Sequence, residues 1–115
     1  MEIKRGVVVF YIGINEAFPR DCDWKKRIGV VLISGIYSAS VKFIGESRNI
    51  CTINMIPLFM VSSECENWKD PLYVIDIFKD QIIESLARIF FSFPSRNLLE
   101  IAKTAQEVCE QTVAS

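Results

Sequence analysis

The pattern of apolar residues changes character near the middle of this 115-residue chain, and that change limits the folds open to it. Up to about residue 61, short runs of β-branched and aromatic residues alternate with turn-forming residues, which is typical of antiparallel strands. From Asp70 onward the apolar residues recur every three or four positions, which is typical of amphipathic helices. The sequence therefore predicts a single α+β domain over residues 1–115, with a sheet in its N-terminal half and helices in its C-terminal half.

Strands are expected at residues 6–14, 28–33 and 36–44. Between the last two, Ser34 and Gly35 provide the short turn of a hairpin. The charged segment before the second strand, residues 15–27, is expected to be a long loop. With one further strand after residue 49, the sequence predicts an antiparallel sheet of about four strands.

The hairpin that follows the third strand has a register suggested by the sequence itself. Closing it through residues 45–49 places Ile44 opposite Ile50 and separates an apolar face from a polar one. The apolar pairs are Phe43 with Cys51, Val41 with Ile53 and Ala39 with Met55, and the polar pairs are Lys42 with Thr52 and Ser40 with Asn54. Pro57 cannot donate a hydrogen bond to a neighbouring strand, so the last strand is expected to end or bulge there.

Two helices are expected after the strands. Asp70 is a good cap for a helix that begins with Pro71 and runs to about Phe93. On a helical wheel, its core face contains Ile75, Phe78, Ile82, Leu86, Ile89 and Phe93. Ser95 then caps a second helix over residues 96–114. A short connection favours antiparallel neighbours, so the two helices are predicted to form a hairpin that covers one face of the sheet.

Several classes of chemistry are excluded or disfavoured by composition. The chain has no histidine, which excludes Ser-His-Asp triads, imidazole bases and metal sites that use imidazole. Its four cysteines are far apart in the sequence and lack the close pairing of zinc or redox motifs. Ser38, Ser40 and Lys42 on one strand face, and Asp21 and Asp23 in the long loop, are weak candidates for catalysis or cation binding, because such residues usually form a solvated surface. We expect a non-enzyme without metal or cofactor.

The compartment can be predicted from the same features. The N-terminal segment has no small-residue cleavage site of the kind that ends a signal peptide, and no run of 18 apolar residues occurs. We therefore expect a cytoplasmic protein with reduced cysteines and no membrane contact.

Charge is distributed unevenly along the chain. Residues 1–63 contain five acidic and eight basic side chains, whereas residues 64–115 contain nine acidic and five basic ones. Within the acidic half, carboxylates recur every four positions along the first helix, beside apolar residues that lie outside its core face. These predicted partner-binding residues are Tyr73, Asp76, Ile77, Asp80, Glu84 and Phe91. Apolar anchors with a charged rim are typical of a protein-binding surface, although another element of the fold could equally cover the three apolar residues.

A second surface is suggested by aromatic residues next to cations in the long loop. The members of this surface are Phe18, Trp24, Lys25, Lys26 and Arg27. An aromatic ring beside cations can stack a base and neutralise phosphates in single-stranded nucleic acid. The isoelectric point near 5.4 and the absence of aromatic residues on the polar sheet face make nucleic-acid binding a weak hypothesis.

The sequence as a whole favours a non-enzymatic protein–protein interaction domain. The form we favour is a small cytoplasmic inhibitor of the immunity-protein type, which neutralises a basic partner such as a toxin or enzyme through its acidic helix face. One alternative is a homo-oligomeric adaptor or assembly factor, for example a homodimer. The other is a weak single-stranded nucleic-acid binder that uses the loop of residues 24–27.

Overall fold

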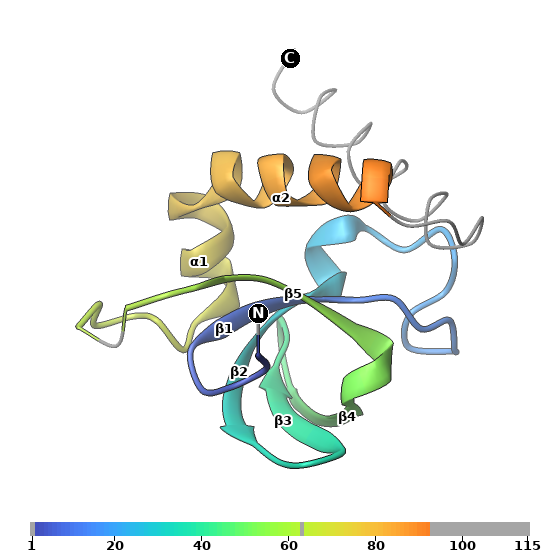
Figure 1. The fold of residues 1–115 in the computed structure, drawn as a ribbon, viewed down its shortest axis with the longest axis horizontal. Helices are drawn as coiled ribbons and strands as arrows, with labels where there is room; N and C mark the ends of the chain where they lie inside the picture. The colour runs from blue at the N-terminus through green and yellow to red at the C-terminus, as the bar shows by residue number, and fades with distance from the viewer. Residues whose placement is uncertain (1, 63, 93–115) are drawn as a thin grey trace.

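The computed structural model describes residues 2–62 and 64–92, the last four of them by backbone alone. Five strands are followed by two helices (Figure 1). The strands are β1 (Val7–Tyr11), β2 (Ile28–Ser34), β3 (Ser38–Lys42), β4 (Ser47–Cys51) and β5 (Met55–Met60). The helices are α1 (Pro71–Ile77) and α2 (Lys79–Ser92), and single 3₁₀ turns lie at Trp24–Arg27 and Thr52–Asn54.

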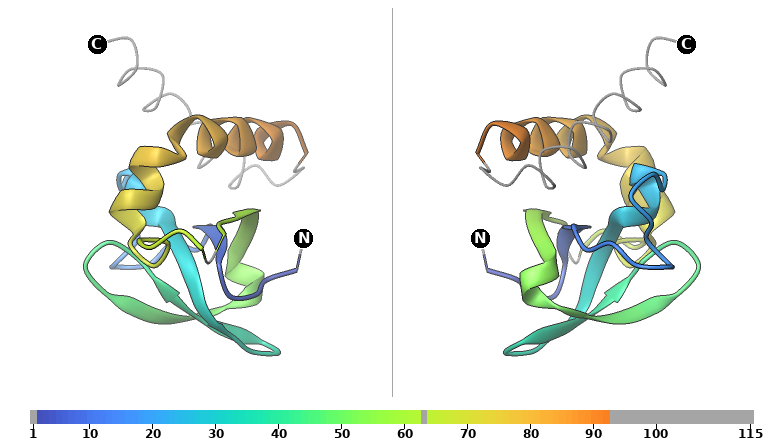
Figure 2. Two further views of the ribbon diagram at one scale, coloured as in Figure 1. Left: turned by 90° about the vertical axis from the view of Figure 1, so that its left-hand side faces the viewer. Right: turned by 90° about the vertical axis from the view of Figure 1, so that its right-hand side faces the viewer.

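All five strands form one antiparallel sheet in the order β4-β3-β2-β1-β5, so the sheet has one strand more than expected. Its two edge strands, β4 and β5, are joined by only the three residues of Thr52–Asn54. Three residues cannot cross a flat five-stranded sheet, in which neighbouring strands lie about 4.8 Å apart. The sheet therefore curls until its edges approach each other at this end, as Figures 1 and 2 show.

The first strand is buried on both of its faces, which explains why it is a continuous apolar run instead of an alternating one. Val7, Val9 and Tyr11 belong to a cluster that receives side chains from all five strands and fills the inside of the curl. Val8 and Phe10 point to the outer face and belong to a second cluster. β1 is thus the centre of the molecule, with a core on each side.

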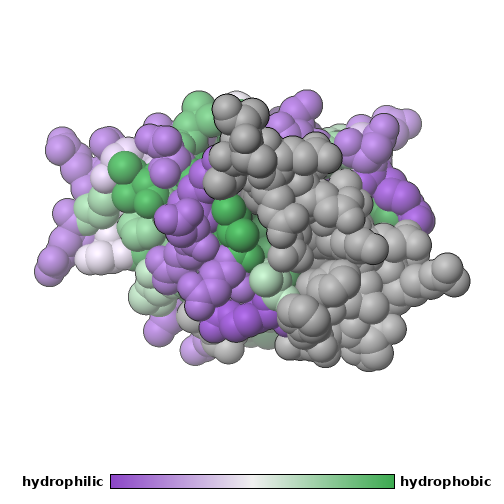
Figure 3. All heavy atoms as spheres, turned by 90° about the horizontal axis from the view of Figure 1, so that it is seen from above, coloured by the Kyte–Doolittle hydropathy of each residue, from purple (hydrophilic) through white to green (hydrophobic). Residues whose placement is uncertain are grey.

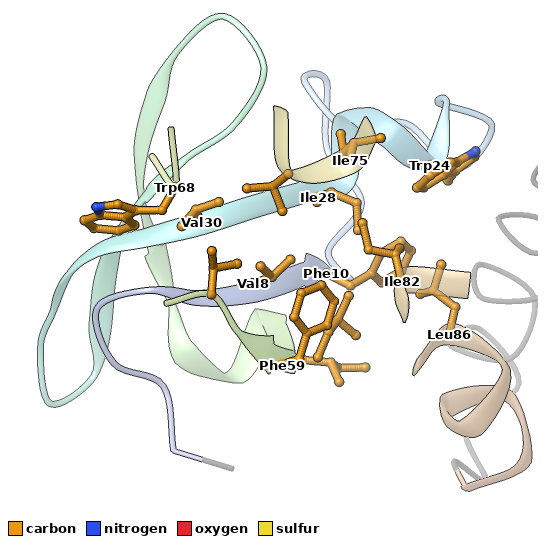
Figure 4. Close-up of a cluster of buried hydrophobic side chains, with 14 residues drawn as sticks. Val8, Phe10, Trp24, Ile28, Val30, Phe59, Trp68, Ile75, Ile82 and Leu86 are labelled. Atoms are coloured by element: carbon orange, nitrogen blue, oxygen red, sulfur yellow. The ribbon is translucent and has the colours of Figure 1, made fainter. Parts of the chain in front are cut away.

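The two helices cover the outer face of the sheet over this second cluster (Figure 4). Ile75 of α1 and both Ile82 and Leu86 of α2 pack with Phe10 of β1 and Phe59 of β5. Asp70 caps α1 as expected, since its side-chain oxygen accepts a hydrogen bond from the N–H of Leu72 at 3.1 Å. The α+β class with an antiparallel sheet and helices packed on it is confirmed.

The prediction of a single helix from Pro71 to about Phe93 is wrong, because α1 ends at Ile77, Phe78 caps it, and α2 begins at Lys79 with a different axis (Figures 1 and 2). Phe78 has φ −107° and ψ 24°, and its half-buried ring packs 5.7 Å from that of Phe59. A bend at this contact lets both helices face the same core cluster on a curled sheet. The second expected helix, residues 96–114, lies outside the described residues, so the helical hairpin stays a prediction.

The predicted register of the β3–β4 hairpin is also wrong. Ile50 lies opposite Ala39 instead of Ile44. The chain reverses earlier than expected, around Gly45, whose φ is +91°, and the N–H of Phe43 donates to the carbonyl of Glu46 at 2.9 Å. A turn residue with positive φ fixes the point of reversal more strongly than the length of the apolar run does.

The observed register also changes the pairing and exposure of the residues that follow β4. β4 ends at Cys51, so Ile53 does not pair with Val41 and is largely exposed, and Met55 starts β5 on the opposite edge of the sheet. Pro57 lies within β5, where the pairing with β1 shifts register between Val8 and Val9. The bulge expected at this proline is therefore present.

Two glycines with positive φ allow a matched test of this backbone. Gly6 has φ +89°, and a Cβ there would lie 3.1 Å from the carbonyl oxygen of Val61, whereas Gly45 has φ +91° and open space around it. We expect Gly45→Ala to lower the free energy of unfolding by about 1 kcal/mol through backbone strain alone. Gly6→Ala adds the contact with Val61, so we expect a loss of about 2 kcal/mol or more. Urea denaturation of both variants measures the difference, and equal losses would contradict the close approach at Gly6.

Candidate functional site

The carboxylates predicted to form a stripe are exposed on the side of the helices that faces away from the sheet. Asp76 lies on α1, whereas Asp80 and Glu84 lie one turn apart on α2, so the bend at Phe78 divides the stripe. Within the described part of the chain, none of the three carboxylates forms an ion pair or a side-chain hydrogen bond. Among the described residues, these three carboxylates therefore present negative charge without a paired cation.

Two large apolar side chains accompany these carboxylates. Ile77, which the sequence singled out, is 56% exposed, and Leu72 is 58% exposed. Leu72 was missed, although it lies one helical turn before Asp76 and outside the predicted core face. Figure 3 shows apolar surface between hydrophilic residues on the described part of this side of the molecule.

The other two predicted members of this surface are placed differently. Tyr73 is half-buried and packs against the core cluster under the helices, and its hydroxyl lies 3.4 Å from the Cys65 thiol in a hydrogen bond. The pKa of Tyr73 is raised, first by the hydrogen bond with Cys65, then by the negative charge of its thiolate, and last by burial. Tyr73 therefore packs beneath the predicted partner-binding surface instead of projecting from it. The side chain of Phe91 lies outside the described residues.

The second predicted surface is mostly interior. Phe18 is buried between the rings of Tyr11 and Phe43, at centroid distances of 4.5 and 5.1 Å. Trp24 is only 1% exposed and belongs to the core cluster under the helices, where its indole N–H finds no hydrogen-bond partner among the described residues. Neither ring is available to stack on a nucleic-acid base.

Arg27 is also buried, at 1% exposure, and it has a structural role. Its guanidinium donates four hydrogen bonds to backbone carbonyls of the preceding segment. The acceptors are the carbonyls of Tyr11 at 2.9 Å, Gly13 at 2.8 Å, Phe18 at 3.2 Å and Pro19 at 2.7 Å. Arg27 thus holds the loop between β1 and β2 in place. Of the predicted basic run, only Lys25 and Lys26 reach the surface.

Within the part of the chain that the structure describes, the weak catalytic candidates do not lie next to further reactive groups. Ser40 and Lys42 share the solvent-facing side of β3, opposite Asn49 and Ser47 of β4. Asp23 accepts a hydrogen bond from the N–H of Lys25 at 3.1 Å and so caps a 3₁₀ turn. These contacts are those of a solvated strand and a helix cap.

A wide hollow of about 720 Å³ lies beside the start of β1 and the end of β5. It is lined by Arg5, Gly6, Met60, Val61, Ser62 and Trp68. The guanidinium of Arg5 lies 5.1 Å and the ammonium of Lys69 lies 5.4 Å from the centroid of the Trp68 ring. Because Trp68 is buried under these cations, the hollow offers a ligand no open aromatic floor.

Among the residues that the structure describes, no three acidic, cysteine or histidine side chains are grouped closely enough to hold a metal ion. Neither α1 nor α2, over their described lengths, has the length and hydrophobicity that crossing a membrane requires. No protein-family model matches the chain, and no curated protein or solved structure is significantly similar to it.

Proposed function

We propose that this chain is a non-catalytic protein-binding domain that docks on a basic protein through an acidic face. We define the acidic face by Leu72, Asp76, Ile77, Asp80 and Glu84. One observation carries the proposal: two apolar side chains that are more than half exposed lie beside three carboxylates without a cationic partner in the described part of the chain.

The two kinds of residue contribute differently to binding. Burial of the exposed parts of Leu72 and Ile77 stabilises the complex by about 1 kcal/mol each, since complete burial of such a side chain contributes roughly 1.5–3 kcal/mol. The carboxylates attract a basic surface over a distance and speed association. Apolar anchors thus lengthen the complex's lifetime, and the charges select the partner.

The partner class that fits is a protein with a basic, phosphate-binding surface. An acidic face competes directly for such a surface, which is how a small inhibitor of the immunity type neutralises a nuclease toxin or another basic enzyme. We place this activity in the cytoplasm as part of the proposal. Nucleic-acid binding by residues 24–27 has less support, because Trp24 and Arg27 are buried, Lys25 is half-buried and only Lys26 of this run is exposed.

Charge reversal on the acidic face tests the proposal. In the double variant Asp80→Lys/Glu84→Lys, we expect each substitution to change the free energy of unfolding by no more than about 0.5 kcal/mol, because both side chains are exposed. Association with the basic partner is expected to slow at least about tenfold and to become less sensitive to salt, because steering is lost. Ile77→Ala is expected instead to speed dissociation.

The measurement uses the full chain as bait to isolate its partner, followed by association and dissociation kinetics at two salt concentrations. Glu16→Lys/Asp21→Lys is the matched control, since it makes the same change of charge at exposed positions in the loop between β1 and β2. If both double variants slow association equally, the effect comes from net charge and not from the acidic face. If Asp80→Lys/Glu84→Lys leaves the association rate unchanged, the acidic face is not part of the interface.

A further inference from the structure

The most exposed large apolar side chains of the described residues are at the end of the sheet remote from the helices. Ile33 is 69%, Ile36 86%, Tyr37 80% and Ile53 79% exposed. We call these four residues the tip patch. The first three belong to the end of β2 and the turn that leads into β3, and Ile53 belongs to the 3₁₀ turn between β4 and β5.

The two segments of the tip patch are bound to each other. Both the N–H and the hydroxyl of Thr52 donate hydrogen bonds to the carbonyl of Tyr37, at 2.9 and 3.3 Å. In Figures 1 and 2 the turn between β2 and β3 accordingly lies next to the segment that joins β4 to β5. The turn is also tight, because a Cβ on Gly35 would lie 2.5 Å from the carbonyl oxygen of Ser38. The four side chains are therefore displayed by an ordered scaffold.

A hollow adjoins these projecting side chains. It measures about 520 Å³ and is lined by Glu2, Ile3, Ser34, Gly35, Ile36 and Thr52. A projecting ring at Tyr37 next to a hollow is a self-complementary shape, since a two-fold axis brings the ring of each copy to the hollow of the other. Large exposed apolar side chains on two segments that are bound to each other are typical of an interaction site.

The charge pattern selects a second copy of the chain as the occupant. Residues 28–41 and 49–63, which contain the whole tip patch, include no charged residue. Apposing these two segments to their counterparts therefore brings together no like charges from the segments themselves, and the adjoining hollow adds only Glu2 from its lining. Self-association through the acidic face would instead bring the three carboxylates of each copy together, and their repulsion would oppose it. A membrane surface fits less well, because the two segments that form the patch contain no basic residue to attract anionic headgroups and the hollow beside it contains Glu2.

We propose that the tip patch is the interface of a two-fold homodimer, in which Tyr37 of each copy enters the hollow beside Ile36 of the other. This interface lies at the opposite end of the sheet from the helices, so dimerisation leaves both acidic faces free (Figure 1). The inference stands on the tip patch alone and does not depend on the proposed basic partner.

Sedimentation equilibrium of the full chain over a wide concentration range tests the dimer. The average mass is expected to rise from 13.1 kDa toward twice that value as the concentration increases. Tyr37→Ser and Ile36→Ser are each expected to weaken dimerisation at least about tenfold, as loss of a central anchor does. Both side chains are too exposed to contribute much to folding, and thermal melts of the variants verify that they fold. Leu72→Ser is the matched control, an equally apolar change on the acidic face, and is expected to leave the dimer intact.

Amide NMR spectra recorded during dilution localise the contact independently. Signals from residues 33–37 and 52–54 are expected to shift as the dimer dissociates. A mass that stays at 13.1 kDa up to about 0.5 mM, well above micromolar affinity, would overturn the proposal. So would a loss of dimer in Leu72→Ser alone, or flotation of the chain with neutral lipid vesicles that Tyr37→Ser abolishes.

Discussion

Arg27→Met is expected to lower the free energy of unfolding by about 3–5 kcal/mol, a large effect for a substitution in the loop between β1 and β2. The methionine keeps much of the apolar stem but removes all four hydrogen bonds of the guanidinium. The carbonyl of Tyr11 receives a buried hydrogen bond from Arg27, so its loss leaves an acceptor that water cannot reach easily. The carbonyl of Phe18 loses one of its two donors and keeps the N–H of Asn15. An unsatisfied buried acceptor costs about 1–3 kcal/mol, which sets the size of the expected effect.

The loop itself is expected to respond first. Within it, the N–H of Asn15 donates to the carbonyl of Phe18, and the N–H of Cys22 donates to that of Pro19. Because Arg27 binds the same two carbonyls, both amides are expected to exchange their hydrogens faster in Arg27→Met. The free energy of unfolding of Arg27→Lys is expected to lie between those of the wild type and Arg27→Met, since an ammonium has only three donors for four acceptors.

Urea denaturation and hydrogen exchange measure these changes. Lys26→Met is the matched control, because it removes the neighbouring exposed cation and is expected to cost no more than about 0.5 kcal/mol. If Arg27→Met proved as stable as Lys26→Met, the desolvation of a buried charge would balance its hydrogen bonds, and Arg27 would not hold the loop.

The role of Arg27 illustrates which features a sequence pattern cannot predict. Trp24 and Arg27 resemble a surface cluster in the sequence, yet both are buried. The acceptors of Arg27 lie 8 to 16 positions earlier in the chain, so they are defined only once the loop has folded back on β1. Local composition carries no information on such contacts.

Local signals predicted the elements better than their pairing. The apolar run of β1 and the cap at Asp70 depend on nearby residues, and both were found where the sequence indicated. The β3–β4 register was not, because Ile50 and Ile53 are both apolar and either could point inward. The turn at Gly45 selects Ile50, and Ile53 is left exposed in the tip patch.

The acidic face was predictable in part for the same reason. The spacing of Asp80 and Glu84 is a property of one helix, and both lie on the exposed side of α2. The bend at Phe78 depends on its packing against Phe59, more than a dozen residues away in sequence, so the separation of Asp76 from the other two carboxylates could not be foreseen.

Ile82→Ala is expected to lower the free energy of unfolding by about 2–5 kcal/mol, because it creates a cavity in the core between α2 and the sheet. Ile82 is fully buried and packs in the cluster that contains Phe10, Phe59 and Leu86 (Figure 4). Ile82→Val removes a single methylene and is expected to cost only about 0.5–1.5 kcal/mol. Gln81→Ala, at the exposed neighbouring position, is expected to be nearly neutral.

Thermal or urea unfolding of these three variants also tests how the acidic face is oriented. Asp80 and Glu84 lie on either side of Ile82 in the sequence of α2, so the docking of Ile82 on the sheet turns both carboxylates toward solvent. A graded loss of stability from Gln81→Ala through Ile82→Val to Ile82→Ala shows that this helix is held by its buried side chain. If Ile82→Ala lowered the free energy of unfolding no more than Gln81→Ala does, α2 would not be packed on the sheet through Ile82. The outward orientation of Asp80 and Glu84, on which the acidic face depends, would then be contradicted.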